Sequence, residues 1–102
     1  MDKNEALKIT KEFALLIKDI LNPSKVFLYG SYANNQYHEN SDIDIAVIVN
    51  RLDGNYLTNL SLLYKLRKQI NLSIEPVLFI EGKDPSGFLE YIEKTGELAY
   101  SI

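Results

Sequence analysis

Two aspartates separated by one residue, Asp42 and Asp44, are the side chains of this sequence best suited to chemistry. They open the run Ile43 to Val49, whose β-branched and apolar residues predict a buried strand. Side chains alternate along a strand, so both carboxylates project from the same face. Two like charges placed side by side repel each other unless a cation lies between them. Mg²⁺, which prefers oxygen ligands, is the expected cation.

Each candidate carboxylate also has a structural interpretation. Asp42 could simply cap or terminate a strand, with Ser41 making a local turn before it. Asp44 lies inside an apolar run, where an unpaired charge is costly, so a metal or another cation is expected beside it. Glu75 lies in a second apolar run and is the third candidate. Its neighbour Pro76 has no amide hydrogen, which predicts that this strand is bulged or at the sheet edge, where Glu75 could remain in water.

A small-residue turn, Gly30-Ser31, follows another predicted buried strand, Val26 to Tyr29. Glycine permits close approach of a backbone to phosphate, and the amides at the start of a short helix after Ser31, with its hydroxyl, would hold phosphate oxygens. The dipeptide alone fits a strand-to-helix turn capped by Ser31 equally well. Because the acidic strand follows, we place four residues on the nucleotide side of the site: Gly30, Ser31, Tyr32 and Ser41.

Periodicity predicts the elements that must position these residues. A helix is expected from about Asn4 to Leu21, and a second from Tyr56 through Ile70 after a turn at residues 53–55. A third helix should have Asp84 as its N-cap and Pro85 as its first residue, and should end at Gly96, with residues 98–102 as a short extension. The lone His38 lies in a polar loop and is expected to be a solvated loop residue.

The order of these motifs resembles the nucleotidyltransferase superfamily that includes DNA polymerase beta, kanamycin nucleotidyltransferase and the minimal nucleotidyltransferases. The resemblance covers nearly the whole chain and implies one minimal nucleotidyltransferase domain over residues 1–102. It implies an α/β (α+β) fold, with a small mixed three-stranded sheet packed against about four helices. The sequence departs from the family pattern at Asn34-Asn35, where Arg-Gly is usual, and at Glu75, where Asp is frequent.

The same resemblance implies the reaction. Asp42, Asp44 and Glu75 would be the catalytic residues and the ligands of two Mg²⁺ ions, and AMP would pass from ATP to a hydroxyl acceptor. The minimal members commonly act beside a small helical HEPN protein in toxin–antitoxin modules, which implies that role and a hydroxyl on the partner protein as acceptor. The alternative is a binding module of the same fold that neutralises its partner by contact, without catalysis; Asn34-Asn35 favours it.

Composition limits the classes of protein to which the chain can belong. With 102 residues, 46% of them hydrophobic, the chain is expected to build one modest core and therefore one domain. The absence of cysteine excludes disulfides and thiolate metal sites. The net charge of −3 and the lack of a basic stripe argue against direct nucleic-acid binding. No signal peptide or membrane span is expected, so the cytoplasm is the predicted location.

Overall fold

The structure is a computed structural model that describes all of residues 1–102. A four-stranded mixed sheet forms its centre, in the order β3-β2-β1-β4. Strand β1 runs antiparallel to both of its neighbours, whereas β2 and β3 are parallel. The elements in chain order are α1 (Lys3–Leu21), β1 (Lys25–Tyr29), β2 (Ile43–Val49), α2 (Tyr56–Leu66), the 3₁₀ turn η1 (Arg67–Gln69), β3 (Ile74–Ile80), α3 (Phe88–Thr95) and β4 (Glu97–Ser101).

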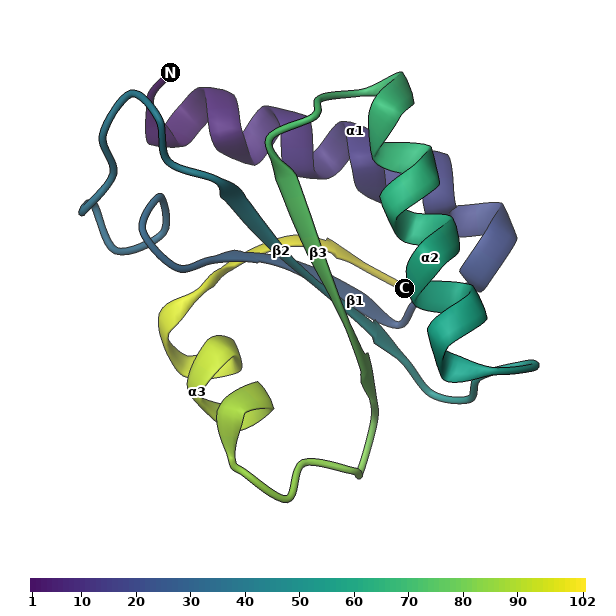
Figure 1. Cartoon of the computed structure of the whole chain (residues 1–102). Helices are drawn as coiled ribbons and strands as arrows, with labels where there is room; N and C mark the ends of the chain where they lie inside the picture. The colour runs from purple at the N-terminus through teal and green to yellow at the C-terminus, as the bar shows by residue number, and fades with distance from the viewer.

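The sheet separates two hydrophobic clusters of different size. Helices α1 and α2 cover one face, and the short helix α3 covers part of the other (Figure 1). The larger cluster joins α1 and α2 to residues such as Val26, Ile45 and Leu78, whereas the smaller one joins α3 to Phe27 and Ile48. Because α3 has only eight residues, it leaves part of its face of the sheet uncovered. The acidic residues lie on that face.

The mixed α/β fold predicted from the sequence is confirmed, with one more strand and fewer helices than expected. The predicted C-terminal extension is β4, which pairs with β1 through a bulge between Val26 and Phe27. The short helix expected after Ser31 is instead a series of turns over residues 30–35. Strand β3, which carries Pro76, lies at the edge of the sheet, as its missing amide hydrogen predicted.

Local capping explains where the first two helices begin and end. The Asp2 side chain accepts a hydrogen bond from the amide of Glu5 at 2.9 Å, and Asn22, before Pro23, ends α1 in the left-handed conformation. Asn55 caps α2 in the same way as Asp2 caps α1, by accepting from the amide of Thr58. These boundaries agree with the predicted ones within a residue, and the 3₁₀ turn η1 continues the predicted second helix.

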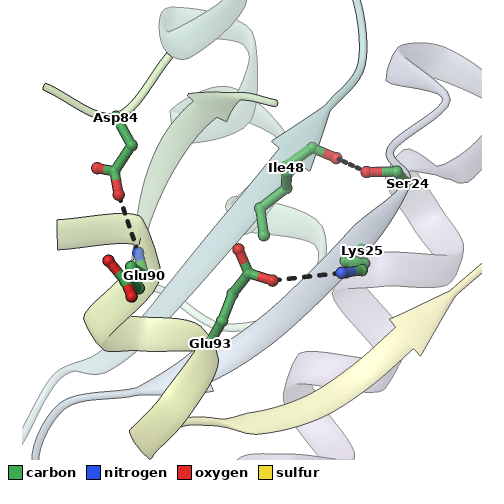
Figure 2. Close-up of polar contacts among 6 residues, drawn as sticks. All are labelled: Ser24, Lys25, Ile48, Asp84, Glu90 and Glu93. Carbon is green, nitrogen blue, oxygen red and sulfur yellow. Dashed lines mark hydrogen bonds and ion pairs between the residues drawn. The ribbon is translucent and has the colours of Figure 1, made fainter. Parts of the chain in front are cut away.

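Helix α3 begins later than predicted, and its N-cap is Gly87 instead of the predicted Asp84. Gly87 precedes the helix, and residues 85–87 form a turn, so Pro85 is not its first residue. The Asp84 carboxylate reaches over this turn and accepts from the amide of Leu89 at 3.0 Å. It also accepts from the amide of Glu90 at 3.0 Å (Figure 2). Lys25 of β1 pairs with Glu93 of α3 at 3.3 Å. The Asp84 contacts and the Lys25–Glu93 ion pair thus hold α3 against the sheet, and the end of that face that carries the acidic residues stays open.

No helix of the structure combines the length and the apolar character that crossing a bilayer requires.

Candidate active site

Asp44 lies at the centre of the candidate site because of its place in the sheet. It is opposite Tyr29 of β1 on one side and opposite Glu75 of β3 on the other. All three side chains point to the face that α3 only partly covers, and each is partly buried. Asp42, one residue before β2, shares this face and is exposed. The strand register therefore places the three carboxylates that the sequence singled out on one face of the sheet.

Gly30 is in contact with Asp44. The glycine has φ of +73°, which side chains disfavour, and a Cβ added to it would overlap Asp44 Oδ2 and lie 3.1 Å from Asp44 Cγ. The sequence predicted a role for Gly30 in approaching phosphate. The structure gives it a second role, which is to make room for the central carboxylate beside the turn.

The charges in the site are incompletely compensated. Burial, then the charge of Asp42 and then that of Glu75, raise the pKa of Asp44 to about 6. Burial, followed by the negative charge of Asp44, also raises the pKa of Tyr29 to about 12, so this phenol stays protonated at neutral pH. No basic side chain forms an ion pair with Asp42 or Asp44. A cation bound at this point would relieve the repulsion between the carboxylates.

Glu75 differs from the two aspartates because it has partners within the protein. The Tyr64 hydroxyl of α2 donates to Glu75 Oε2 at 3.0 Å, and Arg67 Nη1 lies 3.7 Å from Glu75 Oε1. Arg67 also stacks over the Tyr64 ring at 4.8 Å and donates to the Ile74 carbonyl at 2.8 Å. Tyr64 and Arg67 are three residues apart on consecutive helical turns, so they share a face. Sequence reasoning missed both of them.

The donor set fits a hard divalent cation in part. Asp42 and Asp44 offer carboxylate oxygens on one face without a competing cation, as Mg²⁺ prefers. Glu75 is turned toward Tyr64 and Arg67, and no three acidic or histidine side chains converge closely enough to form a complete ligand set. The two aspartates are therefore the residues ready to hold the metal, and Glu75 would have to turn toward them to join.

The turn after β1 presents backbone donors. No carbonyl or side chain of the protein accepts a hydrogen bond from the amides of Ser31, Tyr32 or Ala33, whereas the amide of Asn34 donates to the Gly30 carbonyl at 3.0 Å. Consecutive free amides beside a glycine form the kind of concavity that binds anions. This arrangement does not need the short helix that the sequence predicted.

Two residues predicted on the nucleotide side have side chains that are engaged within the protein. Tyr32 is 1% exposed as a whole residue, packs in the larger core cluster and stacks on Tyr37 with ring centroids 4.8 Å apart, so its side chain is not available to a ligand. The Ser41 hydroxyl accepts from the amide of His38 at 2.9 Å. The Ser41 amide donates back to the His38 carbonyl at 3.0 Å. Ser41 thus closes the loop that leads into Asp42.

Comparison with known proteins identifies the family of the chain. The family model described as polymerase beta nucleotidyltransferase matches residues 8–102. The chain belongs to this nucleotidyltransferase family. Two proteins of Methanocaldococcus jannaschii, both provisionally named protein adenylyltransferases, are 30% and 34% identical to it over 98 and 97 residues. These alignments cover 90% and 91% of this nucleotidyltransferase and 96% of each relative.

Solved structures share the nucleotidyltransferase fold. A protein of Sulfolobus solfataricus, provisionally named a nucleotidyltransferase, superposes with a TM-score of 0.67 at 20% identity, over 94% of this chain and 80% of that one. A toxin–antitoxin structure with AMP-PNP superposes with a TM-score of 0.65 at 24% identity, over 100% of this chain and 75% of that one. At these identities the likeness establishes the architecture.

The Tyr64 and Arg67 contacts lead to a prediction about this nucleotidyltransferase. Tyr64→Phe removes the hydrogen bond to Glu75 but keeps the ring under Arg67. We expect the variant to lose less than about 1 kcal/mol of stability, because the bond is partly exposed. Nucleotide-transfer activity should rise by up to about tenfold in kcat with KM for ATP unchanged, because Glu75 no longer has to break this hydrogen bond before it turns toward the aspartates. Steady-state kinetics and urea unfolding measure both. A lower kcat, or a change in KM for ATP without a change in kcat, would contradict the role of Tyr64 in holding Glu75 away from the aspartates.

Proposed function

We propose that this protein is a Mg²⁺-dependent nucleotidyltransferase that transfers AMP from ATP to a hydroxyl of a partner protein, as the antitoxin of a two-component toxin–antitoxin module. The observation that carries the proposal is the position of Asp44, which is partly buried between the Gly30 turn and Glu75 and has no cationic partner. A protein keeps an uncompensated carboxylate at such a position where a ligand supplies the missing charge.

The names of the relatives support AMP as the transferred group and a toxin–antitoxin module as the biological setting. The two Methanocaldococcus jannaschii proteins are named for adenylyl transfer to protein. One structural neighbour is a toxin–antitoxin structure with AMP-PNP, an ATP analogue. Another is a toxin–antitoxin mutant in which two aspartates, two positions apart, are changed to glutamate, which is the spacing of Asp42 and Asp44. A small helical HEPN-type protein is the partner we propose for this chain.

Different residues of the chain would bind the phosphates and the metal ion during the transfer. The free amide of Ser31, the partly exposed residue of the turn, would bind a phosphate of ATP at the end of β1, and the adjoining amides of Tyr32 and Ala33 would add positive potential. Asp42 and Asp44 would hold Mg²⁺, which supplies charge neutralisation of the triphosphate when bound. Gly30 lets the phosphate turn and Asp44 lie in contact, so the metal ligand and the phosphate donors are close enough to act on one nucleotide.

The acceptor enters from the Glu75 side of the site. Its oxygen forms a bond to the α-phosphorus, the bond from that phosphorus to the β-phosphate bridging oxygen breaks, and pyrophosphate leaves. Glu75, once turned from Tyr64 and Arg67, is the carboxylate placed to accept the hydroxyl proton or to orient the hydroxyl. This turn would couple acceptor entry to the assembly of the third carboxylate.

Ligand linkage tests the nucleotide site directly. At concentrations about ten times its dissociation constant, a ligand that binds only the folded protein stabilises it by ~1.4 kcal/mol. For a domain of this size we expect ATP with Mg²⁺ to raise Tm by roughly 5 to 10 °C, measured by differential scanning fluorimetry. ATP with EDTA should give a much smaller shift, and AMP with Mg²⁺ should as well. No shift at millimolar ATP and Mg²⁺ would overturn the site.

A contact inhibitor is the second candidate function, and two observations favour it. Asn34-Asn35 stands where the family usually has Arg-Gly, and Glu75 is held by Tyr64 and Arg67 away from the aspartates. The triple variant D42A/D44A/E75A separates the candidates. As an enzyme, the wild type should transfer labelled AMP to its partner and the variant should not. If both silence the partner equally without nucleotide, the protein acts by contact.

A further inference from the structure

A groove runs along α2 and η1 next to the candidate active site. It has a volume of about 510 Å³. Tyr64 and Arg67, which contact Glu75, form its wall at the site end. The groove therefore begins where the third carboxylate of the site lies. The lining residues used below are Leu57, Leu60, Tyr64, Lys65, Arg67 and Lys68.

The groove is basic in a protein that is acidic overall. Lys65 and Lys68 are exposed, and no carboxylate of the chain forms an ion pair with either of them. Arg67 is the third cation and shares its charge with Glu75 alone. Against a net charge of −3, three clustered cations with one acidic neighbour produce a local positive potential that attracts negatively charged groups.

The groove also offers apolar surface. Leu57 is 68% exposed and Leu60 is partly exposed, although both belong to the helix that covers the larger core. Exposed leucine beside an apolar groove is typical of a surface that another protein segment covers. The aliphatic stems of the two lysines can add to this surface, so a ligand here would meet both leucine side chains and cations.

Sheet order places the groove on the acceptor side of the site. Asp44 pairs with Tyr29, the neighbour of the Gly30 turn, on one side and with Glu75 on the other. Helix α2 packs against β3, where the Tyr56 hydroxyl donates to the Leu78 carbonyl at 2.7 Å. The phosphate turn and the groove thus lie on opposite sides of β2. An in-line displacement needs its acceptor opposite the leaving pyrophosphate, which is the groove side.

From these observations we infer that the α2 groove docks an acidic, amphipathic segment of the partner protein, and that this segment delivers the acceptor hydroxyl to Glu75. The inference rests on the proposed function for the identity of the reaction, but the docking itself needs no nucleotide. Leucines of the segment would cover Leu57 and Leu60, and its carboxylates would pair with Lys65 and Lys68. A nucleic-acid strand would meet the same cations but would leave the leucines without an apolar partner.

Two synthetic peptides test the docking. One is a short amphipathic helix with leucine on one face, glutamate on the other and a single tyrosine; its counterpart has lysine in place of glutamate. By fluorescence anisotropy, without nucleotide, we expect the acidic peptide to bind at least about tenfold more tightly than the basic one, a difference of ~1.4 kcal/mol. The K65E/K68E variant should lose this preference, because charges of opposite sign now line the groove.

K8E/K11E is the matched control. Lys8 and Lys11 are exposed on α1, are spaced as Lys65 and Lys68 are, and form no ion pair, so the net charge changes equally. This variant should keep at least half of the wild-type affinity. Glutamate near the C-terminal end of α2 interacts unfavourably with the helix dipole, so K65E/K68E could melt at a lower temperature than the wild type. In that case K65Q/K68Q replaces it as the test variant. K65Q/K68Q should lose most of the preference for the acidic peptide.

Three results would overturn the docking surface: no preference for the acidic peptide, equal losses in the two reversed variants, or equal competition by an oligouridylate of the same charge, which would indicate a polyanion site. The Tm shift with ATP and Mg²⁺ is measured on the same samples. Its absence with charge-selective peptide binding intact would overturn the proposed function alone. Its presence without such binding would overturn the docking surface alone.

Discussion

Replacing Asp44 by Asn is expected to abolish AMP transfer while leaving the metal-free protein as stable as the wild type or more stable. Asn has the same shape but no charge, so it relieves the repulsion that Asp42 and Glu75 exert on Asp44. It also removes the carboxylate at the centre of the proposed metal site. A metal ion held there would stabilise the transition state by several kcal/mol. Transfer of labelled AMP should fall at least about 100-fold. The Tm shift with ATP and Mg²⁺ should disappear.

The pH dependence of stability gives this prediction an independent readout. The pKa of Asp44 rises from 3.8 to about 6 on folding, so between these values the folded state binds more protons than the unfolded state. Asp44 therefore costs stability progressively as pH rises from about 4 to 6, and the cost persists above that. The free energy of unfolding of D44N minus that of the wild type should grow over this range. Since Asp44 is partly solvated, we expect about 1–2 kcal/mol.

Urea unfolding in EDTA at several pH values measures this difference. Asp19→Asn serves as the comparison, because Asp19 is exposed on α1 and forms no ion pair, so its replacement should change stability little over this pH range. A loss of more than about 2 kcal/mol in D44N near neutral pH would identify Asp44 as an internally paired structural residue instead.

Gly30→Ala should damage both folding and the site. The new methyl group would have to occupy a left-handed backbone conformation and the space of the Asp44 carboxylate. We expect a loss of at least about 3 kcal/mol of stability, combining the strain of positive φ with steric overlap in a partly buried position. Any folded fraction should lack the Tm shift with ATP and Mg²⁺, because Asp44 and the phosphate turn move apart.

Gly82→Ala separates the two causes. Gly82 has φ of +80° but no atom within 4 Å of an added Cβ, so its substitution introduces backbone strain without overlap. This control should cost only about 1–2 kcal/mol and should keep the response to ATP and Mg²⁺. Equal effects of the two substitutions on stability and ligand response would mean that the contact of Gly30 with Asp44 has no consequence of its own.

The sequence by itself was sufficient for the parts of the protein that depend on neighbours in the chain. The runs around Leu28 and Val47 predicted the two central strands, and strand alternation placed Asp42 and Asp44 on one face. Pro76 predicted the edge strand correctly, since a missing amide hydrogen is a property of one residue. The helix limits at Leu21 and Gly96 followed from local stop signals. Turn residues and periodicity act within a few positions, so they are readable without a fold.

Tertiary structure alone decided the pairings between distant segments. Residues Glu97–Ser101 have no strong strand pattern, and they form β4 because β1 offers a free edge. Whether Asp44 touches Gly30, and whether Glu75 reaches Tyr64 and Arg67, depends on the register of three strands and on how α2 packs at the edge of β3. The residues in these contacts are distant in the chain; Gly30 and Asp44, for example, are 14 positions apart. Their energies arise only after the sheet has formed, so no local pattern records them.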